Sequence, residues 1–262
     1  MARQDDDVRT LVAALQGDAG ARGDLAEVLA DDVEMIALRG RAVGRDAVLE
    51  RLADPAASAM VASATWSEPT ADGDTATVRA TLPAAAQVGG FDYAVHFDTA
   101  GRIDRVEQHL LPPAPLEPAP LALGDDVRDL LAGALANRTP TIVAYVDADG
   151  RPHVSLRATT QVVAPDRIAM WIRDPQGGLL RGIETNANVT IWYRDAERRI
   201  NYQFYGRAHT DDSEATRDAV YDNSPEVERN LDPSRRGVAV VVDVDRVEGA
   251  GPEGRVLMTR AT

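Results

Sequence analysis

Several side chains that can bind an anionic, ring-bearing ligand lie close together in the second half of the chain. They are Arg157, Thr159, Thr160, Trp171, Arg173 and Arg181. A planar guanidinium binds a phosphate through two parallel, charge-assisted hydrogen bonds. A threonine hydroxyl can donate a further hydrogen bond, and an indole can stack on a flat ring. The competing interpretation is that the arginines form ion pairs on the surface and that the aromatic residue fills a core.

The elements that position these residues are short strands. We expect a helix over 125–135, followed by strands over 139–146, 152–160, 167–173, 189–194 and 200–209, a helix over 213–221 and a closing strand over 237–250. Residues 147–151 form a turn, and Gly177-Gly178 lies in a loop. Few helices among many short strands with turn signals indicate a β-barrel.

The first half of the chain places helices before strands. Apolar residues share one helical face between Val8 and Gln16, a second helix follows with Asp24 as its expected N-cap, and a short helix starts at Asp46. After Pro55, strand-like patterns cover residues 58–70, 74–84 and 90–110, the last with a turn around 99–101.

A proline-rich segment separates the two halves. Residues 112–120 read PPAPLEPAP, with five prolines in nine positions, which favours an extended, semi-rigid spacer. We therefore predict a first domain over 1–111, a linker over 112–123 and a second domain over 124–262.

The second domain resembles the pyridoxamine 5'-phosphate oxidase-like family of flavin-binding split barrels. The resemblance rests on the turn at 147–153, the strand ending in Arg157, Trp171, the Gly177-Gly178 loop and residues 206–208. It implies that flavin mononucleotide (FMN) lies in a groove between two subunits of a homodimer. It matches Arg157 to the family's phosphate-binding arginine on the second strand. Thr159 and Thr160 lie next to it as candidate hydroxyl donors, and Trp171 is a candidate to stack on the flavin. Arg173 and Arg181 are the candidates that could supply further positive charge. No catalytic residue is assigned.

Four positions depart from the pattern of this family, and Leu179 is the main one. Where the family has a phosphate-binding lysine after the Gly-rich loop, this chain has Leu179, and Gly182 and Ala187 replace an asparagine and a proline; only Ile183 and Asn186 keep their types. Ile172 also replaces a hydroxyl residue. Three outcomes follow: FMN bound through Arg173 and Arg181, a related cofactor such as a deazaflavin, or no cofactor.

The order of elements in the first domain resembles the SnoaL-like, ketosteroid isomerase-like branch of the nuclear transport factor 2 superfamily. The fold class is therefore expected to be α+β, with an N-terminal cone-shaped domain and a C-terminal split barrel. The polar candidates for acid–base chemistry in the cone are Asp32, Tyr93, His96, Glu107 and His109. Strand alternation places Tyr93 and His96 on opposite faces, which favours a binding or dimerisation module over a catalytic one.

The composition excludes several classes of function. All 28 basic residues are arginine, so neither an internal Schiff base nor a P-loop lysine is available. A net charge of −14 argues against nucleic acid as a partner. The chain has no cysteine, and its histidines lack metal-ligand spacing, so we expect no metal. The N-terminus resembles no signal peptide and no apolar run would span a membrane, so we expect a cytoplasmic protein.

The favoured function is a flavin- or deazaflavin-dependent oxidoreductase that acts on a small organic molecule. Two alternatives stay open. The protein could be a non-catalytic small-molecule binder or dimerisation protein that has lost its flavin, as Leu179, Ile172 and Gly182 suggest. Alternatively, the cone domain could act as an isomerase or cyclase, with the barrel as a scaffold.

Overall fold

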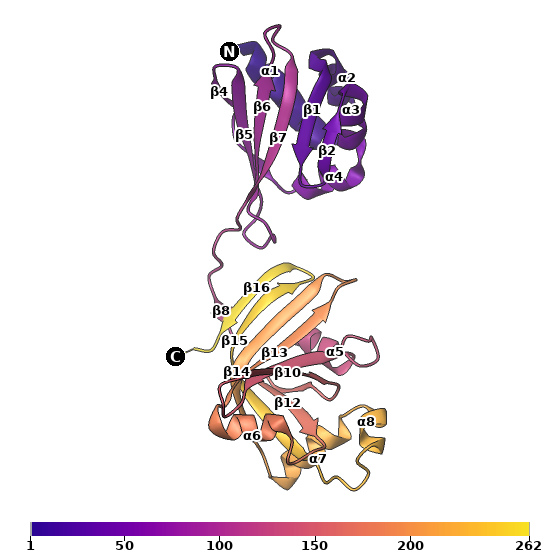
Figure 1. Cartoon of the computed structure of the whole chain (residues 1–262), viewed down its shortest axis with the longest axis vertical. Coiled ribbons are helices and arrows are strands. Elements are labelled where there is room, and N and C mark those ends of the chain that lie inside the picture. The colour runs from indigo at the N-terminus through magenta and orange to yellow at the C-terminus, as the bar shows by residue number, and fades with distance from the viewer. Residues whose placement is uncertain (1, 262) are drawn as a thin grey trace. The chain divides into compact units, whose positions relative to one another are not determined.

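The computed structural model describes residues 2–261, and these form two compact units (Figure 1). The first unit ends at Pro115 and the second begins at Leu116, so the division falls inside the proline-rich segment. Both units are mixed α/β and each contains one large sheet. None of the helices in the described residues combines the length and the apolar composition needed to cross a bilayer.

The first unit consists of helices followed by a sheet. Its helices are α1 (Ala2–Leu15), α2 (Ala19–Val28), α3 (Arg45–Ala53) and α4 (Pro55–Val61), and its strands are β1 (Leu29–Ala37), β2 (Gly40–Val43), β3 (Thr65–Trp66), β4 (Thr70–Asp72), β5 (Thr75–Thr81), β6 (Gly90–Phe97) and β7 (Ile103–Leu111). The strand order is β2-β1-β7-β6-β5-β3, with β4 also paired to β5. Only the β1–β7 pair is parallel among these described strands.

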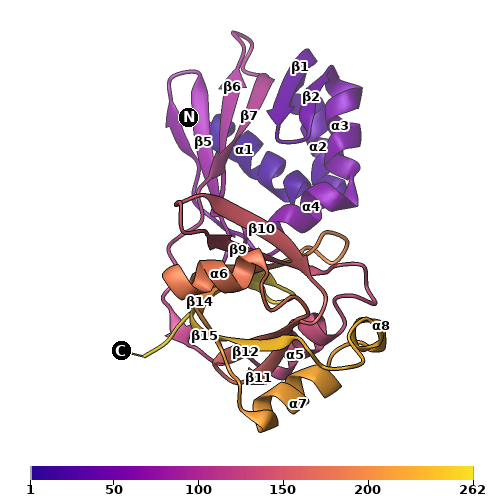
Figure 2. The same cartoon turned by 60° about the horizontal axis from the view of Figure 1, so that its bottom comes forward.

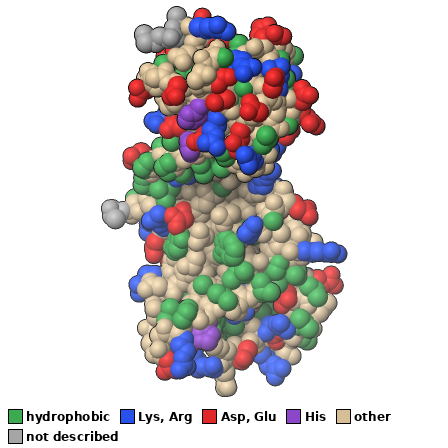
Figure 3. Space-filling model, turned by 45° about the horizontal axis from the view of Figure 1, so that its top comes forward, with side chains coloured by type: hydrophobic (Ala, Val, Ile, Leu, Met, Phe, Trp, Pro, Cys, Tyr) green, Lys and Arg blue, Asp and Glu red, His purple; other side chains and the backbone are tan. Residues whose placement is uncertain are grey.

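Alternation along β6 separates a core face from an outer face. Phe91, Tyr93, Val95 and Phe97 are buried with the helices, whereas His96 lies on the other face and is half-buried. The predicted separation of Tyr93 from His96 is therefore confirmed. Acidic and basic side chains are interspersed over the visible face of this unit (Figure 3).

Two local predictions for the first unit are wrong. Helix α2 begins at Ala19 because Asp18, rather than Asp24, is its N-cap and accepts a hydrogen bond from the backbone N–H of Ala21 at 2.9 Å. The segment after Asp54 is helix α4 instead of a strand. Asp54 caps this helix through the N–H of Ala56, and Pro55 supplies a φ angle that suits the first turn.

The second unit is dominated by one sheet. Its strands are β8 (Ala119–Pro120), β9 (Thr141–Val146), β10 (Pro152–Arg157), β11 (Gln161–Ala164), β12 (Arg167–Ile172), β13 (Asn188–Asp195), β14 (Ile200–Thr210), β15 (Val238–Gly251) and β16 (Gly254–Thr259), and its helices are α5 (Asp125–Ala132), α6 (Gly178–Thr185), α7 (Glu214–Asp222) and α8 (Glu226–Asn230). The strands follow the order β10-β9-β13-β14-β15-β12-β11, with β16 paired to β15 and β8 to β16.

This sheet curls around the main core of the unit and forms an open barrel. Side chains from opposite ends of the strand order share one apolar cluster, among them Val143 of β9, Ile168 of β12 and Phe204 of β14, all fully buried. The 14-residue strand β15 links both halves because it pairs with β12, β14 and β16. Strands β10 and β11 end the strand order, so the barrel is not closed by a backbone ladder between them.

The sequence interpretation missed five elements of this unit, namely strands β8, β11 and β16 and helices α6 and α8. The predicted strand over 152–160 stops at Arg157, and the chain resumes as a separate strand, β11. The Gly-Gly segment opens helix α6, which lies against β9 and β14, while α7 lies against β12 and β15 (Figure 2). The end of the predicted linker forms β8, which pairs with β16, so this part of it belongs to the barrel sheet.

Candidate functional site

A cleft of about 730 Å³ opens where β10 and β12 end and α6 begins. We call it the Arg157 cleft. Its lining combines an apolar wall with a few charged groups, and the residues are Leu135, Pro140, Leu156, Arg157, Ala158, Thr159, Trp171, Ile172, Arg173, Asp174, Gly177, Gly178, Leu179 and Glu228. This volume lies within the range of small-molecule and cofactor sites.

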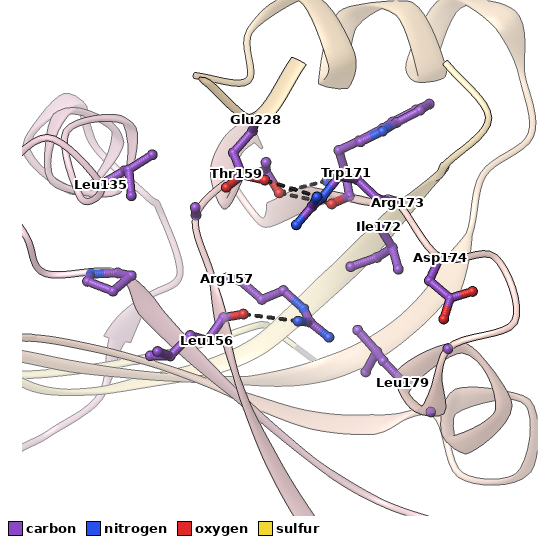
Figure 4. A pocket seen from close by; sticks show the side chains of 14 residues that line it. Leu135, Leu156, Arg157, Thr159, Trp171, Ile172, Arg173, Asp174, Leu179 and Glu228 are labelled. Carbon is purple, nitrogen blue, oxygen red and sulfur yellow. Dashed lines mark hydrogen bonds and ion pairs between the residues drawn. The ribbon is translucent and has the colours of Figure 1, made fainter. Parts of the chain in front are cut away.

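Arg157 is the central charged group of the cleft. Figure 4 shows its side chain extending toward Leu179. One terminal nitrogen of the guanidinium donates to the carbonyl of Leu156 at 3.0 Å. Within the described residues, this is the only hydrogen bond that the side chain of Arg157 makes. The Nε atom is buried without any hydrogen-bond partner. A buried donor that the protein leaves unsatisfied is costly, so it suits a ligand that supplies the missing acceptor.

The electrostatic environment of Arg157 also favours a ligand that carries negative charge. Burial lowers the pKa of its guanidinium, and the positive charge of Arg173 lowers it further, whereas Tyr145 acts in the opposite direction. Two guanidinium groups in one cleft repel each other unless an anion lies between or beside them. Arg173 is partly compensated, because its Nε lies 3.5 Å from Oε2 of Glu228.

The first turn of α6 adds backbone donors to the cleft. Gly177 is the N-cap and Gly178 the first helical residue, and both line the cleft. The first N–H groups of a helix have no partner within the helix and carry partial positive charge. A Cβ atom at the position of Gly178 would lie 2.6 Å from the hydroxyl oxygen of Tyr145, so a larger residue there would require the Tyr145 side chain to shift.

Tyr145 is a residue that the sequence interpretation missed. Its ring packs against α6, since a Cβ at Gly182 would lie 2.5 Å from Cδ2 of Tyr145. The ring also stacks on His153, with centroids 5.2 Å apart, and His153 lies 2.7 Å from Asp147. The spacing of Gly178 and Gly182, one helical turn apart, was the available signal, because two small residues on one helix face leave room for an aromatic ring.

The two threonines do not offer free hydroxyl groups to the cleft. Thr159 lines it, but its hydroxyl accepts from the N–H of Trp171 at 3.0 Å and donates to the carbonyl of the same residue at 3.1 Å. Thr160 is buried and absent from the lining, and its hydroxyl lies 2.6 Å from that of Thr141. This geometry disfavours the predicted donor roles, because barrel contacts already occupy both hydroxyls.

The indole of Trp171 and the guanidinium of Arg181 both form hydrogen bonds outside the centre of the cleft. The indole of Trp171 is directed away from Arg157 (Figure 4) and donates to Asp232 at 3.0 Å. It packs edge-on against Tyr221 in a small separate core. Arg181 is exposed, is not part of the lining, and donates to the carbonyl of Gln176. The predicted stacking role of Trp171 and the predicted cleft role of Arg181 are therefore not supported.

Leu179 occupies the position where the resembled family has a lysine, and it belongs to the barrel core. Its side chain is only 2% exposed and packs in the same cluster as Ile172 and Ile183. Arg157 at the end of β10 and Arg173, the residue after β12, bring two positive charges to the cleft. The donor set therefore fits a phosphate beside an apolar, flat body.

The first unit contributes a smaller pocket of about 490 Å³ on the outer face of its sheet. It is lined in part by Arg79, Asp92 and His109. Two hydrogen bonds of 2.6 and 2.7 Å join Arg79 to Asp92, so the charges there satisfy each other. Burial raises the pKa of Tyr93 to about 12, although a hydrogen bond from Gln108 opposes this shift.

The remaining acid–base candidates of the first unit are Asp32, His96, Glu107 and His109. Asp32 is exposed. His96 bonds to Thr75 at 3.1 Å, and Glu107 lies 3.5 Å from His109 at the sheet surface. No group of three or more His, Asp or Glu side chains is arranged to hold a metal ion anywhere in residues 2–261.

Comparison with known proteins gives structural neighbours only. No protein-family profile and no curated protein matches the chain.

Among solved structures, HupZ of Group A Streptococcus is 21% identical, with 53% of this chain and 98% of that chain covered and a TM-score of 0.39. An FMN-binding protein from Syntrophomonas wolfei is 10% identical (48% and 85% covered, TM-score 0.39). A protein of the pyridoxinephosphate oxidase family from Clostridium acetobutylicum, related to general stress protein 26, is 8% identical (50% and 95% covered, TM-score 0.38). These structural neighbours cover about half of the chain, and they include one protein described as FMN-binding and one described as a member of the pyridoxinephosphate oxidase family.

Proposed function

We propose that the second unit binds FMN, or a deazaflavin, in the Arg157 cleft, and that the protein is an oxidoreductase acting on a small organic molecule. The observation that carries this proposal is the buried, unpartnered Nε of Arg157 in a cleft that also contains the N-terminus of α6. The sequence resemblance of residues 139–195 to flavin-binding split barrels supports the same conclusion independently.

In this proposal, the phosphate is held by Arg157, Arg173 and the first backbone N–H groups of α6. Charge-assisted bonds from guanidinium groups and helix N-termini are among the strongest contacts available to a phosphate. Leu156, Ile172 and Leu135 provide the apolar wall for the ring system. A bound flavin supplies hydride and electron transfer, while the protein supplies binding, orientation and exclusion of water.

We further propose that the barrel unit forms a homodimer through β10. This strand ends the sheet order, so one of its edges lacks a backbone partner among the described strands. Its residues Val154 and Leu156 are 73% and 63% exposed, and Leu156 borders the cleft. An exposed apolar edge strand is a ready site for association with a second chain.

The alternative of a flavin-free binding protein is favoured by specific observations. Leu179 is buried, the hydroxyls of Thr159 and Thr160 are engaged within the barrel, and Glu228 offsets part of the charge of Arg173. Isomerase or cyclase chemistry in the first unit has less support, because Arg79 binds the carboxylate of Asp92 and His96 is hydrogen-bonded to Thr75. A cone-shaped, SnoaL-like domain remains our interpretation of that unit.

The experiment that tests the proposal is a binding titration of the purified protein with FMN, riboflavin and a deazaflavin phosphate. Saturable binding of a phosphorylated cofactor, with weaker binding of riboflavin, is the expected result because riboflavin lacks the phosphate. If none of the three binds at high cofactor concentration, the oxidoreductase proposal fails and the flavin-free alternative takes its place.

A further inference from the structure

A second groove borders the Arg157 cleft in the barrel unit. It has a volume of about 630 Å³ and shares Pro140 and Leu156 with the cleft. We call it the Trp192 groove. Its walls come from the segment before β9, from the end of β13 and from the β13–β14 turn, and its other lining residues are Asn137, Arg138, Thr139, Ile142, Trp192, Arg194, Asp195, Ala196, Glu197 and Arg198.

Three cations of this groove lack anionic partners. The side chains of Arg138, Arg194 and Arg198 are exposed, and none forms a hydrogen bond or ion pair within the described part of the chain. Elsewhere in the same unit, arginines are commonly paired: Arg235 contacts two aspartates at 2.6 Å each, and Arg260 contacts Asp166 at 2.6 Å. Three free guanidinium groups around one groove therefore mark a place for anionic groups of a ligand.

Two carboxylates also line the groove, but they leave it with an excess of positive charge. Asp195 is only 7% exposed, and its Oδ1 accepts from the backbone N–H of Arg198 at 2.9 Å. This bond holds the carboxylate in the turn. Glu197 is exposed beside it. Three arginines against two acids give the lining a net charge of +1.

The groove also has a flat wall. Trp192 is half-buried, and its Nε1 donates to Oδ1 of Asn201 at 2.6 Å, which fixes the orientation of the indole. Pro140, Ile142 and Leu156 extend the apolar surface toward the Arg157 cleft. An oriented indole next to free guanidinium groups favours a ligand with a planar ring and negative groups at its edge.

We propose that the Trp192 groove binds a small aromatic carboxylic acid, held by the ring of Trp192 and by Arg138, Arg194 and Arg198. Because the groove adjoins the Arg157 cleft, this acid is the substrate class of the oxidoreductase. The substrate role rests on the proposed function, whereas the binding itself does not.

The test uses benzene-1,3,5-tricarboxylate, a planar tricarboxylate, titrated by calorimetry into the cofactor-free full-length protein. We expect saturable binding that is tighter than binding of citrate, a non-planar tricarboxylate, or of the neutral benzamide. Arg194→Gln and Arg198→Gln should each weaken binding about tenfold, as expected for one lost charge-assisted contact. Arg207→Gln is the matched control, because Arg207 is exposed in the same unit but is absent from the groove lining.

Three results would overturn the proposal. The first is that the tricarboxylate binds no more tightly than citrate and benzamide. The second is that the Arg194→Gln, Arg198→Gln and Arg207→Gln variants all bind it with equal affinity. The third is that Arg157→Gln abolishes binding, which would place the acid in the Arg157 cleft. Trp192→Phe should keep the preference for the planar acid, and Trp192→Leu should lose it. A parallel FMN titration separates the two proposals: tricarboxylate binding without FMN binding keeps the site but removes its role as a substrate site.

Discussion

The hydroxyl of Thr159 bonds both backbone polar groups of Trp171: it accepts from the N–H at 3.0 Å and donates to the carbonyl at 3.1 Å. The β11–β12 ladder begins only at Gln161, which pairs with Ala169, so the side chain of Thr159 continues the pairing where the backbone cannot. Thr159 is therefore a structural residue of the cleft wall.

Replacement of Thr159 by valine should cost stability and leave cofactor affinity almost unchanged. The shape is kept, but two buried backbone groups lose their partner, which costs about 1–3 kcal/mol in the free energy of unfolding. Urea unfolding and an FMN titration on the same variant measure the two effects. A large loss of FMN affinity in a fully stable Thr159→Val protein would show that the hydroxyl contacts the cofactor instead.

Leu179 gives a second test of the cleft, because its side chain is 2% exposed in the barrel core. Leu179→Ala should lower the free energy of unfolding by about 2–4 kcal/mol through lost burial and a residual cavity. The affinity for inorganic phosphate should stay close to that of the wild type. Leu231→Ala is the control, because Leu231 is 57% exposed. Equal unfolding curves for the two variants would contradict the placement of Leu179 in the core.

The lowered pKa of Asp232 predicts how the free energy of unfolding depends on pH. Burial opposes ionisation of this carboxyl, but the N–H groups of Gly237 and Arg236 and the indole N–H of Trp171 prevail, so its pKa lies below the usual value. A pKa lowered by folding stabilises the folded state above the unfolded-state pKa of about 4, and this stabilisation is lost as the pH falls through the folded-state pKa.

Asp232→Asn should therefore lower the free energy of unfolding at pH 7 by about 1–3 kcal/mol. The difference between the variant and the wild type should shrink as the pH falls below about 4. Denaturant unfolding across this pH range measures both quantities. Two parallel pH profiles would show that Asp232 does not contribute as a carboxylate.

The proposed homodimer has a direct test at β10. Val154→Glu places a charge on the exposed edge strand and should shift the protein from dimer to monomer in light scattering coupled to size exclusion. Val227→Glu on α8 adds the same charge at a residue that is 56% exposed and should leave the oligomeric state unchanged. A monomeric wild type, or a dimer that both variants keep, would refute the β10 interface.

The strands of the barrel could be predicted well from the sequence because their alternation and turn signals are local. Strands β9, β12, β13 and β14 agree with the predicted ranges to within two residues at each end. The helix α6 was missed because Gly177 and Gly178 are typical of loops, and only the tertiary contact with Tyr145 explains a glycine at the start of the helix.

The composition of the site was harder to predict than the fold. Arg157, Thr159, Trp171 and Arg173 do line one cleft, whereas Thr160 and Arg181 do not. Residue types and spacing show which groups could donate to a phosphate, but they do not show whether another part of the barrel already uses those groups. The hydroxyl of Thr160 and the indole of Trp171 are both engaged by residues distant in sequence, Thr141 and Asp232.

The central claim is that Arg157 binds the phosphate of a flavin, and one comparison tests it most directly: the ratio of FMN affinity to riboflavin affinity in the wild type and in Arg157→Gln. We expect the wild type to prefer FMN and the variant to lose about 10–100-fold of that preference, since a charge-assisted bond contributes about 1.5–3 kcal/mol. Arg207→Gln should behave like the wild type. An unchanged ratio in a folded Arg157→Gln protein would contradict the assignment of the cleft.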